Sequence, residues 1–498
     1  MLAEISILLL SAFLFVYYWF RVQYSYWDRK QIPSIRPSLF FGNLKDLVFM
    51  RKASSDIFAD LYNNPIGKNS PYIGIYVFHK PALLLRDPEL IKKVLIKDFN
   101  SFQNHYTYLS PHTDPIGGNM LFMMKTPMWR DLRQKLTPFF TSGKLRNMFP
   151  LVDSIGDKLD DYLKSLSSNS SPIVDLKEVC SLYTTDVIAS VAFGFDANSL
   201  NEPNGDFRRN GRKIFDFHLK TAISFFTAFF LHQLSFIIRP RFLTQETSHF
   251  LVKSIDYAMA ERKKSGVARN DLIDTLLQFE KEGYPKNVIV GQAAIFWLAG
   301  FETTSSVMTF LLLELVRNQE IQDKLREEIK EFLIETNGKF DYDKINSMEY
   351  LNMVVQESAR MYSTLPFLDR ECLEGYQVDE ELHIPKGTPV FVPNFGIARD
   401  PKYFDEPNKF DPERFHPSNK QFIDNVATMP FGTGPRSCIG ERLGLIQVKV
   451  GIFNFLRNHK LVANEKTVKD VIIDPMALVV TMKGKMYCDV VRDTMVDL

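Results

Sequence analysis

The first twenty residues, MLAEISILLLSAFLFVYYWF, form an almost unbroken apolar run in which Glu4 is the only charged side chain. A helix needs about 20 apolar residues to span the hydrocarbon core of a bilayer. Tyr17, Tyr18 and Trp19 lie near one end of the run, as aromatic residues do at a membrane interface. The basic leader and small-residue cleavage site of a secretory signal peptide are missing from this run. The pattern therefore predicts a transmembrane signal anchor over residues 1–20.

The segment that follows the apolar run is charged and contains prolines. Its first charges are basic, and basic residues favour the cytosolic side of a membrane. The stretch IPSIRP (residues 32–37) holds two prolines, which restrict the backbone and stiffen it. We therefore expect residues 21–38 to be a linker and residues 39–498 to form one catalytic body on the cytosolic side.

Most of this body repeats its apolar residues with the period of a helix. Near its start, YIGIYVFHKPALLLRD (residues 72–87) holds two β-prone runs separated by a Lys-Pro pair, which indicates a hairpin. Short β-like runs return in the last quarter, as in TPVFVPNF and MALVVTMKGKMYCDVV. We expect a mainly α-helical fold with a small β part behind the anchor helix.

A second apolar stretch, AAIFWLAGFETTSSVMTFLLL (residues 293–313), is also long enough to cross a membrane. Glu302 and four hydroxyl residues stand at its centre, and a carboxylate at mid-bilayer costs about 2.5–3.5 kcal/mol. The flanking sequences continue a soluble helical pattern. We predict a long helix buried in the protein, with a polar interruption that serves a function.

Charge and cysteine content narrow the classes of function. Lys plus Arg (60) nearly equals Asp plus Glu (59), so the charge balance gives no indication of a nucleic-acid partner. The four cysteines lie far apart and form no CxxC pair. This spacing argues against a zinc site or a disulfide framework and suits a reducing compartment.

Cys438 stands in the loop FGTGPRSCIG (residues 431–440), directly before a run with helical period. A thiolate binds iron strongly, and thiolate-ligated haem favours cleavage of the O–O bond. The N–H groups at the start of the following helix would face the sulfur and lower the pKa of the thiol. Phe431 could shield the sulfur, and Arg436 could meet a haem propionate. A lone cysteine is more often a buried, inert thiol, so the loop by itself leaves both roles open.

The loop fits the pattern Phe-x-x-Gly-x-Arg-x-Cys-x-Gly, which resembles the haem-thiolate signature of the cytochrome P-450 superfamily. Further motifs resemble those of the same family and follow its order: WRDLR, AGFET, ESAR and FDPERF. The resemblance covers the whole chain. Phrases such as KLTPFFTSGKLRNMF are most like insect microsomal members of the family-six kind.

This resemblance implies a haem-thiolate monooxygenase that carries haem b, with the thiolate of Cys438 as the axial ligand and only metal ligand of the iron. Trp129 and Arg133 add a physical argument, because an indole N–H and a guanidinium one helical turn apart make a clamp for a carboxylate. The implied cofactor-binding residues are Cys438, Trp129, Arg133, Arg370, Phe431 and Arg436.

The resemblance also gives Glu302 and Thr303 the catalytic role of delivering protons to bound O₂. Thr303 would hydrogen-bond the oxygen and an ordered water, and Glu302 would relay protons from the surface. A Thr–Ser run inside a helix usually bonds back to its own carbonyl oxygens and bends the helix slightly. Thr303 could deliver protons and also bond back to a carbonyl oxygen of its helix, so the sequence leaves both roles open.

Glu357 and Arg360 lie three residues apart, so they share one face of a predicted helix. On the surface such a pair would contribute only about 0.2–0.5 kcal/mol. Apolar neighbours indicate burial instead, and a buried pair needs a further partner. The resemblance offers Arg414 as this partner, in a structural triad that holds the loop leading to Cys438.

The implied substrates are lipophilic, among them xenobiotics such as plant toxins or insecticides. The Phe-rich run ISFFTAFFLHQLSFIIRPRF (residues 223–242) corresponds in the family to a region that roofs the pocket and can touch the bilayer. Candidate substrate contacts are Phe122, Phe301, Leu365, Phe367 and Met476.

The electrons must come from a partner protein, because the sequence offers no nucleotide-binding loop. The family implies NADPH-cytochrome reductase, with cytochrome b5 as a second candidate donor. Lys135, Arg442 and Lys449 could offer the donor a basic face. The implied location is the endoplasmic reticulum membrane, crossed once, with the catalytic domain in the cytosol.

Two other functions remain open from the sequence. One is a haem-thiolate isomerase or dehydratase that needs no reductase, although such an enzyme has no use for a proton relay to O₂. The other is a membrane-tethered, haem-binding sensor without turnover. The chain also departs from the family at Ser363-Thr364, where many relatives have consecutive prolines.

Overall fold

The structure, a computed structural model, describes residues 1–167, 172–215, 218–269, 271–339, 341–422, 426–477 and 479–496. The chain forms two compact units, each assembled from separate stretches of sequence. Unit 1 comprises Met1–Thr107, Leu365–Asp405 and Asp424–Ser437, and unit 2 comprises Tyr108–Thr364, Glu406–Ile423 and Cys438–Leu498. Helices dominate, which confirms the mainly α-helical fold with a small β part.

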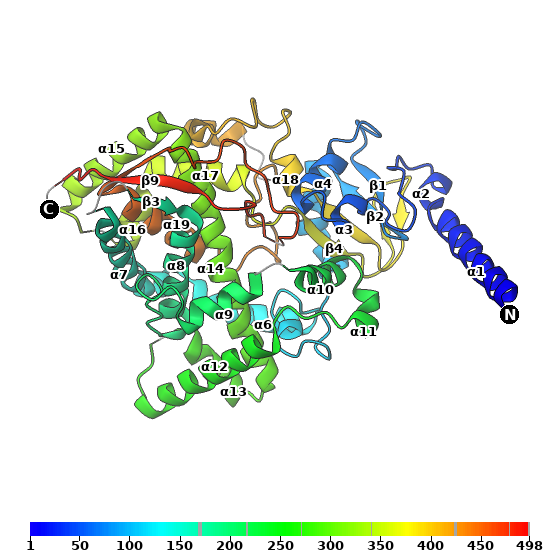
Figure 1. Cartoon of the computed structure of the whole chain (residues 1–498), viewed down its shortest axis with the longest axis horizontal. Helices are drawn as coiled ribbons and strands as arrows, with labels where there is room; N and C mark the ends of the chain where they lie inside the picture. Colours follow the sequence, from blue (N-terminus) through cyan, green and yellow to red (C-terminus); the bar gives the residue numbers. More distant parts are fainter. Residues whose placement is uncertain are drawn as a thin grey trace. The chain divides into compact units, whose positions relative to one another are not determined.

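Unit 1 contains most of the strands (Figure 1). Its larger sheet has the order β1-β2-β7-β4, formed by β1 (Tyr72–Val77), β2 (Lys80–Leu85), β7 (Pro389–Val392) and β4 (Leu368–Glu371). A second pair consists of β5 (Tyr376–Gln377) and β6 (His383–Ile384). The helical elements are α1 (Leu2–Gln23), α2 (Tyr26–Arg29), α3 (Lys45–Val48), α4 (Ser54–Tyr62), α5 (Pro88–Lys92), η1 (Lys93–Lys97), η2 (Phe99–Phe102) and α18 (Asn394–Ile397).

The predicted hairpin over residues 72–87 is confirmed, because β1 and β2 pair antiparallel. Its turn, however, consists of Phe78 and His79, and the prediction of a Lys-Pro turn is wrong. Pro81 lies inside β2, outside the part of β2 that pairs with β7. A proline has no N–H to give to a neighbouring strand, and this position does not require one from the β7 side.

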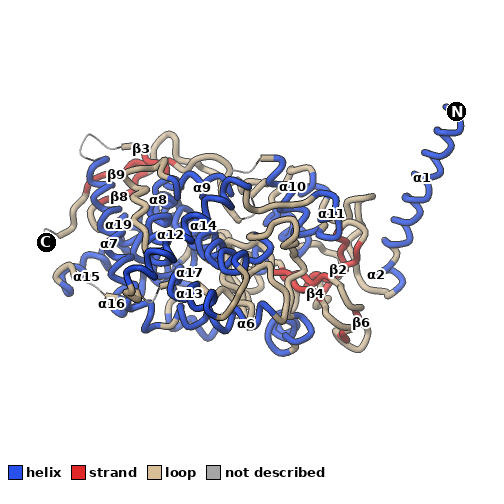
Figure 2. Tube along the Cα trace, turned by 90° about the horizontal axis from the view of Figure 1, so that it is seen from below, coloured by secondary structure: helices blue, strands red, loops and turns tan. Residues whose placement is uncertain are grey.

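Helix α1 carries the N-terminal apolar run, and none of its residues is buried (Figure 2). By length and composition this helix is able to cross a membrane. The segment after it, predicted as a linker, packs on β1. Trp27 is fully buried, and its indole N–H donates to the carbonyl oxygen of Ile75 at 3.0 Å. The Tyr76 hydroxyl donates to the carbonyl oxygen of Tyr24 at 2.8 Å, so the chain is fixed to the sheet directly after α1.

Unit 2 is almost entirely helical. Its α-helices are α6 (Met128–Leu136), α7 (Ser142–Ser167), α8 (Leu176–Ile188), α9 (Asp206–Phe215), α10 (Leu219–Phe230), α11 (Ser235–Ile238), α12 (Gln245–Ser265), α13 (Leu272–Lys281), α14 (Lys286–Arg317), α15 (Gln319–Thr336), α16 (Tyr342–Ser347), α17 (Glu349–Met361) and α19 (Glu441–Leu456). Short helical turns are η3 (Gly117–Asn119), η4 (Thr137–Phe140), η5 (Ala189–Phe193), η6 (His232–Leu234), η7 (Pro412–Phe415) and η8 (Pro417–Phe422). The sheet β3-β9-β8 is formed by β3 (Ile173–Asp175), β9 (Tyr487–Arg492) and β8 (His459–Val462).

Helix α14 contains the second apolar stretch of the sequence. It packs against both α8 and α19. Although it is long and apolar enough to span a membrane, 72% of its most apolar window is buried inside the protein. The prediction of a helix buried in the protein is therefore confirmed. Among the described residues, the bent pair of α10 with η6 and α11 also passes the test of length and composition as one broken span.

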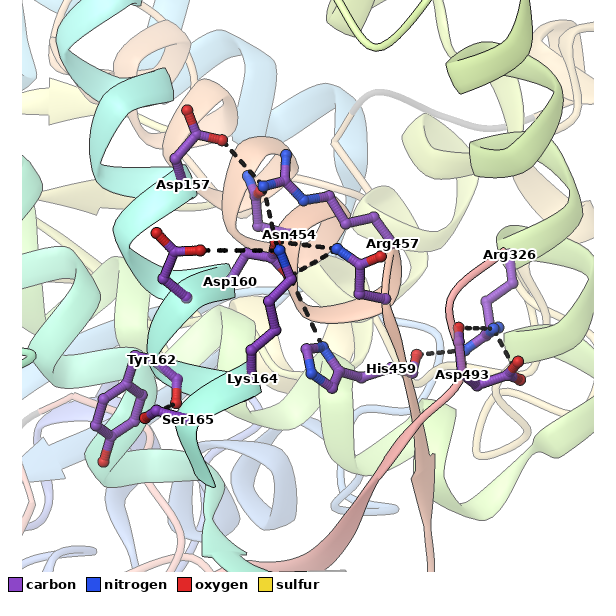
Figure 3. Close-up of polar contacts among 12 residues, drawn as sticks. Asp157, Asp160, Tyr162, Lys164, Ser165, Arg326, Asn454, Arg457, His459 and Asp493 are labelled. Atoms are coloured by element: carbon purple, nitrogen blue, oxygen red, sulfur yellow. Dashed lines mark hydrogen bonds and ion pairs between the residues drawn. The ribbon is translucent and has the colours of Figure 1, made fainter. Parts of the chain in front are cut away.

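A buried polar cluster ties α7 to the C-terminal end of α19 (Figure 3). Asp160 is fully buried and pairs with Lys164 at 2.7 Å and with Arg457 at 2.8 Å. Burial alone would raise the pKa of Asp160, but hydrogen bonds from these two cations lower it below its ordinary value. The carboxylate is thus held ionised beneath the surface, and it fixes the helix that follows Cys438 from its far end.

Candidate active site

Cys438 lies in unit 2, two residues before α19 begins. Its side chain is accessible, yet surrounding protein atoms desolvate the sulfur enough to raise the pKa of the thiol. The sulfur is thus accessible at a place where protein atoms surround it on other sides. The N–H groups of Gly440 and Glu441 act on the sulfur in the predicted direction, as does Arg133. These contributions lower the pKa as predicted, but burial outweighs them, so the pKa of the free thiol lies above its ordinary value.

The loop over residues 431–440 begins in unit 1 and ends in unit 2. Gly434 has a φ of 76°, and a Cβ at this position would lie 2.1 Å from the carbonyl oxygen of Leu95, so only glycine fits. Arg436 donates from Nε to the carbonyl oxygen of Gln103 at 2.8 Å. Phe431 is half-buried. In unit 1 the loop is therefore fixed by its backbone and by Arg436.

Helix α14 has a single accessible face within its buried part. Between residues 288 and 316 every side chain is buried except those at Ile295, Ala299, Gly300, Thr303 and Val307. Positions four residues apart lie on one face of a helix. Thr303 lies at the middle of this accessible face.

The hydroxyl of Thr303 bonds back to its own helix. Its Oγ1 donates to the carbonyl oxygen of Ala299 at 2.6 Å. Ser305 and Thr309 do the same, to the carbonyl oxygens of Glu302 and Ser305 respectively. The back-bonding considered from the sequence is thus present, and the Thr303 oxygen keeps its lone pairs as acceptors toward the accessible face.

Glu302 is 5% exposed and, among the described residues, its carboxyl group has no hydrogen bond or ion pair. Burial raises the pKa of Glu302, and the positive charges of Lys177 and Arg208 oppose this rise. Arg208 is itself buried, and its Nη2 donates to Glu178 at 2.8 Å. Arg212 reaches the same carboxylate at 2.7 Å. A half-exposed ion cluster therefore lies within electrostatic range of a buried acid that can hold a proton.

No local pattern along the chain indicated this ion cluster. Lys177 and Glu178 lie in the first turn of α8, and Arg208 lies in α9. All three residues are more than ninety positions away from Glu302 in the sequence. Only packing brings these charges to α14.

The predicted clamp on α6 is built as expected from its spacing. Trp129 is 4% exposed, and Arg133 lies one turn further along the helix. Among the described residues, no carboxylate pairs with the Arg133 guanidinium. Burial lowers the pKa of Arg133, and the charge of the Cys438 thiolate opposes this effect. A partly buried guanidinium without an acidic partner fits an anionic group held next to the thiolate.

A second cationic group lies in unit 1. Arg370 is 2% exposed, and its Nε is buried without a hydrogen-bond partner among the described residues. The charges of Arg370 and Arg436 both act on His105. Burial lowers the pKa of His105 to about 4, so this ring is neutral at pH 7. The two guanidinium groups therefore both lie close enough to His105 to act on it electrostatically.

Asp369 holds this cationic group in position. His105 Nδ1 lies 2.9 Å from Asp369 Oδ1, and the backbone N–H of Thr107 donates to Asp369 Oδ2 at 2.6 Å. Sequence reasoning missed both His105 and Asp369, because a single histidine and a distant aspartate carry no local pattern. Within unit 2, the accessible thiol of Cys438, the accessible face of α14 and the Arg133 guanidinium fit an anionic iron cofactor.

The three residues of the predicted triad come together in unit 2. Glu357 and Arg360 are fully buried and form two parallel bonds, from Nε at 2.7 Å and from Nη2 at 2.8 Å. Arg414 Nε lies 3.5 Å from Glu357 Oε1. The backbone N–H of Asp411 also donates to Glu357, and Arg360 donates to the carbonyl oxygen of Pro407. The triad therefore fixes residues 407–414 against α17.

The candidate substrate contacts have different surroundings. Phe122 in unit 2 faces Phe229 of α10, with ring centroids 6.5 Å apart. In unit 1, Phe367 stacks on Phe58 at 4.1 Å. Leu365 and Met476 are half-buried.

Phe301 is 1% exposed, and its ring packs beside Trp297 and Phe215. It therefore lies on a different face of α14 from Thr303. Phe301 remains a candidate substrate contact, whereas Thr303 lies on the accessible face of α14.

The basic face proposed for an electron donor is smaller than predicted. Lys449 is 6% exposed and donates to Asn346 Oδ1 at 2.7 Å, so it cannot belong to an exposed face. Lys135 pairs with Glu282 at 2.5 Å. Arg442 is exposed and bonds Ser142 at 3.2 Å. The helical period of α19 places position 449 on the buried side of the helix. The charge of Lys449 had suggested an exposed position instead.

Replacing Lys449 with methionine is expected to stabilise the protein at neutral pH. Burial lowers the pKa of Lys449 to about 8, whereas a lysine in an unfolded chain titrates near 10.4. Below pH 8 the Lys449 ammonium is charged and buried in the folded protein, which lowers the free energy of unfolding. This loss of stability becomes smaller as the pH rises from 8 to about 10. Lys449→Met should therefore raise the free energy of unfolding by about 2 kcal/mol at pH 7, with a smaller gain at pH 9–10.

The thermal midpoint measured across this pH range tests the expectation. Lys253→Met is the matched control, because Lys253 is an exposed lysine on α12 and should show no pH-dependent gain. A gain from Lys449→Met that stays constant from pH 7 to pH 10 would show that packing, and not the buried charge, accounts for it.

Comparisons with known proteins agree with this arrangement. The family model described as Cytochrome P450 matches residues 32–488. The chain is 42% identical to the protein named "Probable cytochrome P450 6g2" of Drosophila melanogaster, over 95% of each chain. It is 38% identical to "Probable cytochrome P450 6w1" of the same organism over 96% of each chain, and 36% identical to "Cytochrome P450 6j1" of Blattella germanica over 94% of each chain. The chain therefore belongs to the cytochrome P450 family, monooxygenases that bind haem through a cysteine thiolate.

Proposed function

We propose that this protein is a membrane-anchored monooxygenase in which the thiolate of Cys438 is the axial ligand of haem b. It inserts one oxygen atom from O₂ into lipophilic substrates. The observation that carries this proposal is the accessible but desolvated thiol, approached by the N–H groups of Gly440 and Glu441. Binding to iron removes the proton from a coordinating thiol, so the raised pKa of the free thiol is no obstacle to this role.

The remaining cofactor contacts follow from the cations near the site. Trp129 and Arg133 in unit 2 would hold one or both haem propionates, and Arg370 and Arg436 in unit 1 would do the same. Phe431 would cover the sulfur and exclude water. Arg133 supports this assignment, because it is partly buried and no carboxylate pairs with it among the described residues, and a buried guanidinium requires an anion. Arg370 is buried beside Asp369, and its Nε has no hydrogen-bond partner among the described residues.

Thr303 and Glu302 would deliver protons during turnover. Bound haem supplies the reduction and cleavage of O₂, and the protein supplies the protons. The Thr303 hydroxyl lies on the accessible face of α14, where its oxygen can accept a hydrogen bond from water. Glu302 can hold a proton because burial raises its pKa. The charges of Lys177, Arg208 and Glu178 act on the pKa of this acid and would tune how readily it gives up its proton.

Replacing Thr303 with alanine is expected to separate electron use from product formation. The variant should fold, bind haem and oxidise NADPH in the presence of reductase. Product formed per NADPH should fall sharply, and the electrons should appear as hydrogen peroxide, because a positioned proton donor contributes about 10²–10⁴-fold. Peroxide and product measured together against NADPH consumption give the result.

Thr303→Ser is the matched control, since it keeps the hydroxyl and should keep most of the coupling. Glu302→Gln should slow proton delivery while leaving the Thr303 hydroxyl in place. If Thr303→Ala yields product as efficiently as the natural protein, the proton-delivery role of Thr303 is ruled out.

The substrates would be apolar xenobiotics such as plant toxins or insecticides, which reach the site from the membrane. The roof formed by α10, η6 and α11 supports this route, because Leu234, Phe236 and Ile237 are exposed there. Phe122 and Phe229 would line the path below this roof, with Leu365, Phe367 and Met476 as further candidate contacts. Electrons would come from NADPH through a cytochrome reductase, with cytochrome b5 as an additional donor. The location would be the endoplasmic reticulum membrane, with the catalytic domain in the cytosol.

Two experiments separate this function from the alternatives. A haem-thiolate isomerase or dehydratase would turn over without NADPH and reductase, whereas the proposed monooxygenase requires both. A non-catalytic haem sensor would show no shift in the spin state of the ferric iron with a panel of lipophilic compounds. For the proposed enzyme we expect such shifts, because substrate displaces water from the iron.

A further inference from the structure

The short linker between α13 and α14 is held firmly by the helices on either side of it. It consists of residues 282–285. The backbone N–H of Tyr284 donates to the carbonyl oxygen of Phe279 at 3.0 Å, and the two rings lie 5.2 Å apart. Phe279 is buried in α13, and Pro285 is the N-cap residue of α14. The linker can therefore act as a fixed support for a neighbouring element.

This neighbouring element is α6, to which the linker is joined by side-chain hydrogen bonds. The Tyr284 hydroxyl donates to Asp131 Oδ2. Lys135 Nζ donates to the Tyr284 hydroxyl oxygen at 2.8 Å and to Glu282 Oε2 at 2.5 Å. The Lys135 ammonium also lies 4.8 Å from the centre of the Tyr284 ring, within the range of a cation–π interaction. Tyr284 is thus a donor to one residue of α6 and an acceptor from another.

The contacts between Lys135 and the linker form a network of charges. The hydrogen bond to Glu282 is the largest cause that raises the pKa of Lys135, and the same bond lowers the pKa of Glu282. Gln278 donates to the other carboxylate oxygen of Glu282 at 2.9 Å, and Asp131 Oδ1 lies 3.6 Å from Lys135 Nζ. An isolated surface ion pair contributes little, whereas a network with fixed geometry can hold an element in place.

The residues that contact the linker lie on the side of α6 opposite the predicted clamp. Successive residues of a helix are turned by about 100°, so positions two apart face nearly opposite directions. Trp129 and Arg133 therefore lie on one side of α6, and Asp131 and Lys135 lie on the other. A rotation of α6 about its axis would move the Arg133 guanidinium away from Cys438, whose charge acts on it.

A helix as short as α6 keeps its orientation only through contacts with other elements. It has nine residues, and isolated helices shorter than about 12 residues are marginal in water. Leu132 and Leu136 are fully buried and fix its depth. Apolar packing is non-directional, so it resists rotation less than hydrogen bonds of fixed geometry. The bonds to Glu282 and Tyr284 supply this directional restraint.

We propose that Tyr284 and Glu282 are positioning residues for the cofactor. They hold the outer side of α6 and thereby keep the Arg133 guanidinium in place to bind a haem propionate. This inference rests on the proposed haem contact of Arg133. It also gives Lys135, which was considered for the docking of an electron donor, the different role of holding α6.

A double-mutant cycle on the full-length haem protein tests this role. The variants are Tyr284→Phe, which keeps the ring and loses the hydroxyl, Arg133→Met, and the two together. Two quantities are measured: the rate at which haem passes to an excess of haem-free myoglobin, and the reduction potential of the iron. Tyr72→Phe is the matched control, because the Tyr72 hydroxyl donates to Asp379 at 2.6 Å within unit 1.

We expect Tyr284→Phe to speed haem transfer several-fold and to lower the reduction potential, as Arg133→Met should do more strongly. A cation close to the iron favours the reduced state, so a cation that is held less closely lowers the potential. When Arg133 is already replaced, Tyr284→Phe should add little, because residues that act through one contact are not additive. Tyr72→Phe should leave both quantities unchanged.

The cycle separates this inference from the haem contact on which it rests. If Tyr284→Phe changes neither quantity, or changes both equally with and without Arg133, the positioning role is overturned and the haem contact of Arg133 stands. If Arg133→Met itself changes neither quantity, the haem contact of Arg133 is wrong, and the positioning role is wrong with it.

Exchanging the charges of the ion pair gives a second test, which does not depend on Tyr284. Lys135→Glu places a carboxylate next to Glu282 and Asp131, and it should speed haem transfer more than Tyr284→Phe does. Adding Glu282→Lys restores an ion pair of opposite sense and should recover most of the natural rate. A double variant that loses haem as fast as Lys135→Glu alone would show that Glu282 does not hold α6.

Discussion

Replacing Cys438 with alanine is expected to abolish the thiolate character of the haem and all monooxygenase activity. The iron would lose its only protein ligand, since alanine has no donor atom. The absorption spectrum of the reduced protein with CO reports this directly, because a thiolate opposite CO shifts the main band to long wavelength. The haem content should also fall, because Trp129, Arg133 and the other cations would hold the cofactor without a bond to iron.

Cys180→Ala is the matched control for this variant. Cys180 is a fully buried thiol on α8, and burial raises its pKa to well above the ordinary value. Its loss removes packing but no proposed ligand, so the shifted CO band should remain. An unchanged shifted band in Cys438→Ala, with full haem content, would show that another residue binds the iron.

Local features of the fold were predictable because they depend on neighbours in the sequence. The apolar run of α1, the hairpin of β1 and β2, and the buried helix α14 each follow from the period or length of an apolar pattern. The triad was predictable in part, because the spacing of Glu357 and Arg360 puts them on one face of α17. Its third member, Arg414, came only from the family resemblance.

Features that depend on packing between distant segments were not predictable. The charges of Lys177 and Arg208 reach Glu302 only because α8 and α9 pack on α14. The pairing of His105 with Asp369 joins residues 264 positions apart. The orientation of α14 had the same limitation, since a helix that is apolar on all sides gives no sign of which of its faces is accessible. Phe301 was proposed because its segment resembles a substrate-contact region, and the accessible positions of α14 are small or branched residues.

Opposing electrostatic effects also could not be weighed from the sequence. The position of Cys438 just before α19 correctly predicted that N–H groups lower the pKa of its thiol. The net pKa depends on how closely other atoms surround the sulfur, and this is a property of the packed protein. Lys449 shows the same limit, because its charge indicated the surface while the period of α19 placed it inside.

Replacing Arg360 with methionine is expected to cause the largest loss of stability among single changes outside the haem ligand. Glu357 is fully buried, and two of its bonds come from Arg360. Removing one partner of a buried pair leaves an uncompensated charge, which costs about 3–5 kcal/mol. Arg414, at 3.5 Å from Glu357, compensates only in part. Unfolding in denaturant, followed together with haem release, measures the loss.

The double variant Glu357→Leu with Arg360→Met distinguishes charge from position. It removes both charges, so it should recover much of the stability lost in Arg360→Met. The double variant still lacks the bond from Arg360 to the carbonyl oxygen of Pro407 and the bond from the Asp411 N–H to Glu357. The segment before Cys438 should therefore remain less firmly held, and haem should dissociate faster than in the natural protein. Equal losses of stability in the single and double variants would contradict a buried charge as the cause. Arg317→Met is the surface comparison, since Arg317 is more exposed and lies 3.5 Å from Glu314, and it should cost less than Arg360→Met.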